Sequence, residues 1–387
     1  MTAVDHPEAT VADVLAAVEA LTPTIAGRAA EVEAVRRVPP DLFDAVARTG
    51  ALRLLLPRSH HGIGADLPAA LRVFEALARA DASVAWTVMI GGNGWVDLAG
   101  LPSASFDALF AGPGDVVVAG VFRPSGSVTA VDGGYRVTGR WSFATGCERA
   151  DWLYGNCVEG VVDGVPQLRI AVFRPDDVVI EDTWTATGLC GTGSHHFRVD
   201  DLVVPAHRTL VPMVDEPCLD EPVVRVPVPS MLALAIAAVA LGVAQGALDD
   251  VTALATTTTP LFAPAPLATN PLFQHDLATA VTALRAARAL VHETATSVWD
   301  AAVERAPFTL ARRADARAAA TWATAHAATV VDIAYRSAGA GAVYAESPLQ
   351  RRFRDVHALA QHFLVKSDTL TTAGAVLAGQ EPAVAVF

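Results

Sequence analysis

Lysine is almost absent from this chain of 387 residues, since Lys366 is the single one among 28 lysines and arginines. Acidic residues number 41, which gives a net charge of -13. The arginines form no basic stripe, and a nucleic-acid surface needs clustered cations to contact phosphates. We therefore expect no nucleic-acid partner, and one lysine leaves almost no candidate for Schiff-base chemistry.

Cysteine is scarce as well and shows no ligand spacing. Neither a Cys-x-x-Cys pair nor a zinc pattern is present, and reduced thiols are expected. Adjacent histidines occur at His60-His61 and His195-His196, but neighbours in a strand point to opposite faces, and no carboxylate or cysteine pattern completes a site. The sequence predicts no metal site. The four cysteines are Cys147, Cys157, Cys190 and Cys218.

Signals for export or membrane insertion are also missing. Met1 to Ala16 carries acidic residues without an apolar core, so it does not resemble a signal peptide, and we expect a cytoplasmic protein. The uncharged stretch Val226 to Leu248 is long enough for a membrane span. Pro227 and Pro229 interrupt its start, however, and a helix that is apolar all round also suits the centre of a bundle. We predict a buried core helix and no membrane.

What the chain does contain is hydrophobic residues, at 52%, which suffice for two or three packed subdomains. Residues 1–115 are predicted to be helical, 116–220 strand-rich and 221–387 helical again. The strand-rich part has a hairpin signal at Asp132-Gly133-Gly134, and strands without intervening helices indicate a small antiparallel barrel or sandwich. Alanine-rich helices over 229–256, 272–302, 309–340 and 348–378 suggest a four-helix bundle. In the first part, helices are expected at Val11–Val35, Asp41–Thr49 and Leu67–Ala80, and the segment Ala82–Leu98 is expected to be buried.

Two motifs in the strand-rich part carry the functional interpretation: Trp141 to Gly146 (Trp-Ser-Phe-Ala-Thr-Gly) and Gly188 to Ser194 (Gly-Leu-Cys-Gly-Thr-Gly-Ser). With Gly133–Gly139, Asp200–Pro205 and Arg354-Asp355 in this order, the chain resembles the acyl-CoA dehydrogenase superfamily. The resemblance implies an α+β fold with an N-terminal helical domain (1–115), a central antiparallel β-barrel that carries the flavin strand (116–220) and a C-terminal four-helix bundle (221–387). The bundle would serve oligomerisation, flavin and substrate, and a homotetramer, a dimer of dimers, is expected.

The resemblance also implies flavin contacts. Phe143, Ala144 and Thr145 would lie along the isoalloxazine ring, with Thr145 the first hydrogen-bonding candidate and Ser142 the second. Without the resemblance, Thr145 and Ser142 would be ordinary strand residues. Trp184 stands where related monooxygenases often place an aromatic ring. The segment Asn270 to Ala278 resembles the one that reaches a neighbouring subunit's dinucleotide, but Thr256 to Thr259 replaces the family's arginine, so FMN and FAD both stay open. The other cofactor-binding candidates are Phe122, Phe273, Gln274, Gly339 and Gly341.

The C-terminal segment decides between two chemistries. Dehydrogenases of this family commonly carry a glutamate base shortly after Arg354-Asp355, whereas this chain continues from Val356 to Phe363 without an acid. The segment is similar to that of two-component flavin monooxygenases, which hydroxylate dibenzothiophene, phenols or steroid rings or act as nitrososynthases. Those enzymes take reduced flavin from a separate NAD(P)H reductase and use O₂ through a flavin C4a-(hydro)peroxide.

Within this resemblance His362 matches the catalytic histidine, and imidazole titrates close to neutrality. A buried helix histidine is the alternative. His357, five residues earlier, is the weaker candidate. Asn93 stands near the position where such hydroxylases often carry a histidine, and Trp86 and Trp95 are candidates to line the substrate pocket.

We therefore predict a monooxygenase that uses FMNH₂ or FADH₂ and O₂ to oxygenate a small aromatic or amine-bearing molecule of secondary metabolism. One alternative is an acyl-CoA or acyl-carrier dehydrogenase with a relocated base, which would hold a tightly bound FAD. The other is a non-catalytic scaffold of the same fold.

Overall fold

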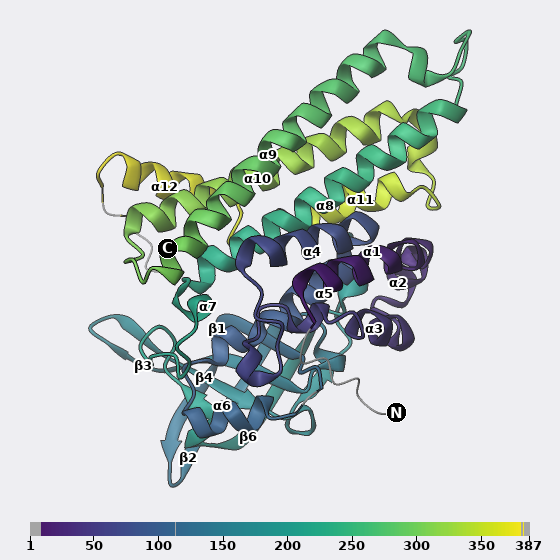
Figure 1. The fold of residues 1–387 in the computed structure, drawn as a ribbon. Helices are drawn as coiled ribbons and strands as arrows, with labels where there is room; N and C mark the ends of the chain where they lie inside the picture. The colour runs from purple at the N-terminus through teal and green to yellow at the C-terminus, as the bar shows by residue number, and fades with distance from the viewer. Residues whose placement is uncertain (1–8, 113, 381, 383–387) are drawn as a thin grey trace.

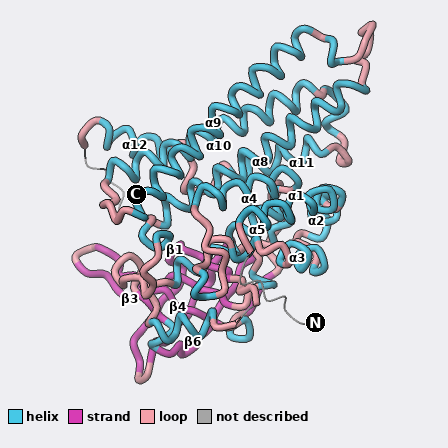
Figure 2. The backbone as a smooth tube through the Cα atoms, in the orientation of Figure 1, coloured by secondary structure: helices cyan, strands magenta, loops and turns pink. Residues whose placement is uncertain are grey.

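The computed structural model describes residues 9–112, 114–380 and 382, so part of the predicted N-terminal helical region and the last residues lie outside it. A sheet occupies one end of the molecule, long helices occupy the other, and the N-terminal helices pack between them (Figure 1). The same division is visible along the backbone, where strands and long helices separate cleanly (Figure 2).

The N-terminal helices are set by their caps. Asp66 accepts a hydrogen bond from the Ala69 N–H and Asp81 accepts one from the Val84 N–H, which starts α4 and α5. The single helix predicted over 11–35 is wrong, because the chain forms two helices that meet at Arg28, where the backbone leaves helical geometry. The elements are α1 (Val11–Gly27), α2 (Ala29–Val35), α3 (Pro40–Ala47), α4 (Leu67–Ala80), α5 (Ala82–Asn93), the 3₁₀ segment η3 (Gly94–Leu98) and α6 (Ser103–Phe110).

The strands form one mixed sheet in the order β5-β6-β2-β1-β3-β4-β7. The predicted hairpin connects β1 and β2 antiparallel, but β1 and β3 run parallel, so the purely antiparallel prediction is wrong for that pair. After β2 the chain returns through η4 (Cys147–Arg149) and joins β1 on its other edge. The strands are β1 (Val118–Val131), β2 (Gly134–Ala144), β3 (Trp152–Val162), β4 (Val165–Phe173), β5 (Val179–Glu181), β6 (His195–Pro205) and β7 (Thr209–Leu210).

Trp141 fills the centre of the sheet's core. Its ring is fully buried, stacks on Phe197 at a centroid distance of 4.9 Å and donates its Nε1–H to the Asn156 carbonyl at 2.8 Å. Glycines make room for the indole, since a Cβ added at Gly155 would lie 2.4 Å from it.

A pair of glycines in β3 tests this packing. Gly155→Ala is expected to lower the free energy of unfolding by about 1–3 kcal/mol, because the added methyl overpacks Trp141. Gly160→Ala in the same strand is the control, since an added Cβ there meets nothing within 4 Å. Urea unfolding of both variants measures the difference, and equal stabilities would contradict the packing described.

The C-terminal region differs from the prediction at its end. One helix over 348–378 is wrong: α11 ends at Leu359, and α12 starts at Asp368. After Leu359 the backbone forms turns with i→i+3 hydrogen bonds, such as the one from the His362 N–H to the Leu359 carbonyl, instead of continuing the helix. The stretch contains no Pro or Gly to signal this break. The helices are α7 (Pro222–Arg225), α8 (Val228–Thr257), α9 (Pro271–Val303), α10 (Leu310–Ser337), α11 (Pro348–Leu359) and α12 (Asp368–Leu377).

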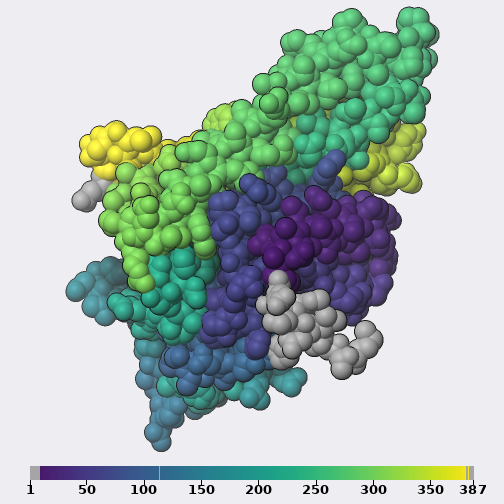
Figure 3. Space-filling view, viewed as in Figure 1, coloured from purple at the N-terminus to yellow at the C-terminus, as the bar shows by residue number. Residues whose placement is uncertain are grey.

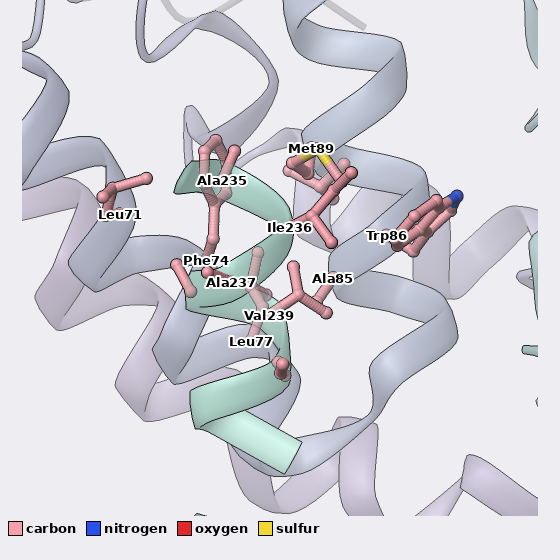
Figure 4. Close-up of a cluster of buried hydrophobic side chains, with 14 of the residues drawn as sticks. Leu71, Phe74, Leu77, Ala85, Trp86, Met89, Ala235, Ile236, Ala237 and Val239 are labelled. Carbon is pink, nitrogen blue, oxygen red and sulfur yellow. The ribbon is translucent and has the colours of Figure 1, made fainter. Parts of the chain in front are cut away.

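Helix α8 forms the centre of the hydrophobic core, as predicted. Its length and composition would suffice to cross a membrane, but 89% of its most apolar window is buried inside the protein. Gly242 lets it approach α4 closely, since an added Cβ would lie 2.3 Å from the Glu75 carbonyl oxygen. Side chains of α4, α5 and α8 interlock here, and Trp86 lies at the edge of the cluster with its indole nitrogen directed outward (Figure 4).

Candidate active site

The end of strand β2 exposes an aromatic ring. The pairing of β2 with β6 is interrupted between Trp141 and Ala144, and Phe143 there has the left-handed φ of 69°. Its side chain is 65% exposed. A left-handed phenylalanine is strained and is retained where the surroundings demand it. The Phe143 ring stands edge-on to Trp184 at a centroid distance of 6.0 Å and lies 6.4 Å from the His196 ring.

Behind this ring lies a chain of buried hydroxyl groups. The Thr145 hydroxyl accepts a hydrogen bond from Trp86 Nε1 at 3.2 Å and shares another with Ser194 at 2.8 Å. Ser194 in turn bonds the Thr192 hydroxyl at 2.7 Å. The Thr145 backbone N–H donates to the Phe143 carbonyl. Both Thr145 donors thus have partners within the protein, and the residue supports the wall formed by Phe143 and Trp184 from behind.

Trp86 connects the hydroxyl chain to His362. The two rings meet edge-on with their centroids 5.7 Å apart. His362 lies in the turn after α11 and therefore does not share a helix with His357, contrary to the prediction. Its Nδ1 accepts the Leu364 N–H at 3.3 Å, which places the imidazole proton on Nε2. Burial, with a contribution from Arg317, lowers the pKa of His362 to about 4. His362 is therefore a neutral hydrogen-bond donor at neutral pH.

A second histidine, His195, orients Trp184. Its side chain is fully buried, and its Nδ1 accepts hydrogen bonds from the Thr183 and Trp184 N–H groups at 3.1 and 3.2 Å. Burial lowers the pKa of His195, although Glu148 and Asp182 act in the opposite direction. Local sequence suggests His195 only as a possible metal ligand in the His195-His196 pair. The pairing of Ala144 with His195 across β2 and β6 could not be seen from local sequence.

Three of the predicted substrate-binding residues make contacts with residues outside this group. Asn93 donates its amide to the Met89 carbonyl at 2.8 Å and so closes α5. Trp95 is 2% exposed and packs against Phe106 in the core. His357 pairs with Asp332 at 2.9 Å. Each of these side chains thus has a contact within the protein, and their substrate-binding role stays a prediction.

The remaining cofactor candidates divide into two groups. Ser142 and Ala144 flank Phe143, and the Phe122 carbonyl accepts the Asn156 amide at 2.9 Å on the neighbouring part of β1. The other four lie at the start of α9 and just after α10, at the end of the helical bundle that points away from the sheet (Figure 1). These four are Phe273, Gln274, Gly339 and Gly341.

The wall around Phe143 fits a flat aromatic group. An exposed aromatic ring is bordered by Trp184 and by His196, whose Nδ1 is buried without a hydrogen-bond partner. Such a combination of apolar faces with few polar atoms is typical of cofactor sites. A nucleophilic thiol is not part of it, because burial raises the pKa of Cys147 and of Cys157 to about 12. Within the residues that the structure describes, no group of three or more His, Cys, Asp or Glu side chains is arranged to hold a metal ion.

Comparison with known proteins identifies the family of this chain. Residues 14–99 match the acyl-CoA dehydrogenase N-terminal domain and residues 234–367 the acyl-CoA dehydrogenase C-terminal domain. The chain is 32% identical to indole-3-acetate monooxygenase of Pseudomonas putida, over 95% of this chain and 94% of that protein. It is 32% identical to HsaA of Rhodococcus jostii (strain RHA1), a flavin-dependent monooxygenase oxygenase subunit, over 88% and 91%. XiaF from Streptomyces sp., solved with FADH2 and glycerol, superposes with a TM-score of 0.91 at 25% identity, over 97% of this chain and 98% of that one.

The two domain matches and these relatives show that the chain is a flavin-dependent oxidoreductase with the acyl-CoA dehydrogenase fold. The chain belongs to the two-component flavin-dependent monooxygenases of the acyl-CoA dehydrogenase superfamily. Its cofactor is a reduced flavin, and O₂ is its co-substrate.

Proposed function

We propose that this chain oxygenates a small aromatic molecule that carries a phenol or an indole ring, with His362 as the group that polarises the reacting oxygen. The position of His362, edge-on to Trp86 and neutral, is the observation that carries the proposal. One of the similar proteins named above acts, by its name, on indole-3-acetate, and the rings of Trp86, Phe143 and Trp184 suit an aromatic partner.

The site offers no carboxylate base of the dehydrogenase kind. Asp355 is the nearest acid on the N-terminal side of His362, but it is 4% exposed and accepts the Leu189 N–H at 2.7 Å. A carboxylate engaged in this way is turned toward the protein and does not face a substrate. This contact weighs against the dehydrogenase alternative, and the family to which the chain belongs weighs against a non-catalytic scaffold.

Each part of the site has a defined task. A bound reduced flavin supplies the electrons that activate O₂. Phe143 and Trp184 would hold the flat face of the ring, and Ser142 the polar edge beside them. Trp86 would cover the substrate side and keep water out. The His362 Nε2–H would donate a hydrogen bond to oxygen that gains negative charge, which a neutral imidazole does without a change of protonation.

Rapid mixing tests the function directly. Protein with anaerobically reduced FMN or FAD is mixed with oxygenated buffer, with and without indole-3-acetate or a simple phenol. We expect a transient absorbing species that outlives the one seen with free flavin, followed by oxygenated product. The proposal would be refuted if the flavin reoxidised as fast as free flavin and neither indole-3-acetate nor the phenol gave a product. Oxidation of an acyl-thioester would instead restore the dehydrogenase alternative.

The same proposal includes the partners. We expect a separate NAD(P)H flavin reductase, a cytoplasmic location, no nucleic-acid or membrane partner, and either FMN or FAD as the flavin. We also expect a homotetramer. The bundle end that carries Phe273 and Gly339 exposes large apolar side chains, among them Phe262 at 96% and Tyr344 at 67%. This end projects from the rest of the molecule (Figure 3), and a second subunit covering it would bring Phe273 and Gln274 to a neighbouring flavin.

Leu272→Glu tests the tetramer. Leu272 is 69% exposed in the first turn of α9, where a glutamate favours the helix, so the variant should fold. A charge buried in a subunit interface should lower the molar mass in light scattering and weaken reduced-flavin affinity about tenfold or more. Leu377→Glu, at an exposed site on α12, is the control. A tetramer that persists in Leu272→Glu would remove this end from the interface.

A further inference from the structure

Leu189 has an unusual backbone conformation and lies between the helical bundle and the rings of Phe143 and Trp184, which we call the flavin wall. Its φ of 53° is left-handed, which is uncommon for a leucine and is retained only when the surroundings fix it. Hydrogen bonds to its N–H and carbonyl groups do so. The Leu189 N–H donates to Asp355 Oδ1 at 2.7 Å, and the Leu189 carbonyl accepts the Trp184 Nε1–H at 3.0 Å and the Thr192 hydroxyl at 2.9 Å.

Both halves of the Phe143–Trp184 wall depend on the position of this one residue. Trp184, held by the Leu189 carbonyl, faces Phe143. Thr192, held by the same carbonyl, continues through Ser194 to the Thr145 hydroxyl and from there to Trp86. A shift of Leu189 would therefore move the indole of Trp184 and disturb the hydroxyl chain at the same time.

The helix that carries Asp355 also determines the place of His362. Helix α11 lies directly against the loop between β5 and β6, which we call the flavin loop. A Cβ added at Gly188 in this loop would lie 2.2 Å from the Arg354 carbonyl oxygen. Arg354 donates to the Thr187 carbonyl at 2.7 Å and pairs with Glu33 at 2.7 Å. His362 follows three residues after the end of α11. One buried contact thus connects the flavin loop to the segment that bears the catalytic candidate.

Burying the Asp355 carboxyl group costs free energy, which argues that its oxygen is needed as the acceptor of the Leu189 N–H. Burial and the nearby Asp81 raise the pKa of Asp355 to about 7, while Arg351 and Arg354 act in the opposite direction. Burial also raises the pKa of Asp81. In the unfolded chain Asp355 ionises near its ordinary value of 3.8, so its contribution to stability declines as pH rises from about 4 to about 7.

We propose that Asp355 is a positioning residue of the active site, which through the Leu189 peptide holds Trp184 and the hydroxyl chain in place and sets α11, and with it His362, against the flavin loop. The proposal rests on the proposed function, because it takes the Phe143–Trp184 wall to be the flavin site. Asp355 touches neither flavin nor substrate and acts only through Leu189.

Two substitutions separate the acceptor from the charge. Asp355→Asn keeps an oxygen that can accept the Leu189 N–H, whereas Asp355→Leu keeps similar volume and removes it. We expect amide hydrogen exchange at Leu189 in the flavin-free protein to accelerate at least about tenfold in Asp355→Leu, and the Kd for reduced FMN or FAD to rise by about tenfold or more. Asp355→Asn should stay within about threefold of the unsubstituted protein in both. Asp249→Leu, which breaks an exposed ion pair between α8 and α4, is the control for general loss of stability.

The readouts keep this inference apart from the proposed function. Exchange at Leu189 is measured without flavin, so it tests the positioning even if the protein bound no reduced flavin, an outcome that would refute the proposed function alone. Normal Leu189 exchange in Asp355→Leu, or accelerated exchange with unchanged flavin affinity, would overturn the proposal. If Asp355→Leu does not fold, Gly188→Ala disturbs the same docking from the loop side, and protection of Leu189 equal to that of the unsubstituted protein would overturn the proposal equally.

Discussion

Replacing His362 by alanine is expected to lower product formation by about 10²–10³-fold while the protein remains folded and reduced flavin still reacts with O₂. The expectation follows from the tautomer. Because Nδ1 accepts the Leu364 N–H, the Nε2–H is the atom available to a reacting oxygen beside Trp86. Product measured by chromatography, set against hydrogen peroxide, should show electrons diverted from substrate to peroxide. His357→Ala is the control, because His357 forms an exposed pair with Asp332.

The pH dependence separates a neutral donor from a titrating base. The pKa of His362 is lowered from 6.5 to about 4, so the folded protein keeps the imidazole neutral over the range in which the unfolded chain would protonate it. Its contribution to stability is present above pH 6.5 and is lost as pH falls toward 4. We expect product formation that depends on His362 to show no ionisation near pH 6.5. Unchanged turnover in His362→Ala would remove the catalytic role, and an ionisation near pH 6.5 that disappears in the variant would contradict the neutral state.

Local patterns predicted the elements well wherever a cap or a turn marks them. The helix expected over Leu67–Ala80 has those bounds in the structure, because Asp66 caps it and its apolar face is regular. The hairpin at Asp132-Gly133-Gly134 follows from its turn residues. The break after Leu359 was missed for the opposite reason. Leu364 and Val365 are buried and continue the apolar spacing through the turns, so nothing in the sequence marks the end of α11.

Non-local pairing is where local sequence stops being informative. The parallel pairing of β1 with β3 depends on the path of the chain after β2 and not on the composition of either strand. In the site, the resemblance identified Phe143 and Trp184, which do meet. It gave no sign of the bond between Leu189 and Asp355, which are 166 residues apart, or of the histidine that holds the Trp184 turn. These contacts have no local pattern, because the tertiary fold alone brings the partners together.

Thr145 gives the second large effect, and the structure changes the reason for it. Thr145→Leu should weaken reduced-flavin binding by about 10²-fold or more, because two penalties combine. The longer side chain overpacks a residue that is only 4% exposed, at about 1–3 kcal/mol. Loss of the hydroxyl also leaves Trp86 Nε1 without its acceptor, at about 1–3 kcal/mol.

Two further variants separate these penalties. Thr145→Ser retains the hydroxyl and should bind reduced flavin nearly as well as the unsubstituted protein, whereas Thr145→Val removes only the hydroxyl and should lie between Ser and Leu. Anaerobic titration with FMNH₂ or FADH₂ gives the affinities, and urea unfolding shows how much of each loss is general destabilisation. If Val binds like Ser, the buried hydroxyl chain does not support the flavin wall. If Leu binds like the unsubstituted protein, Thr145 lies outside the site, and the wall would have to be built from Phe143 and Trp184 alone.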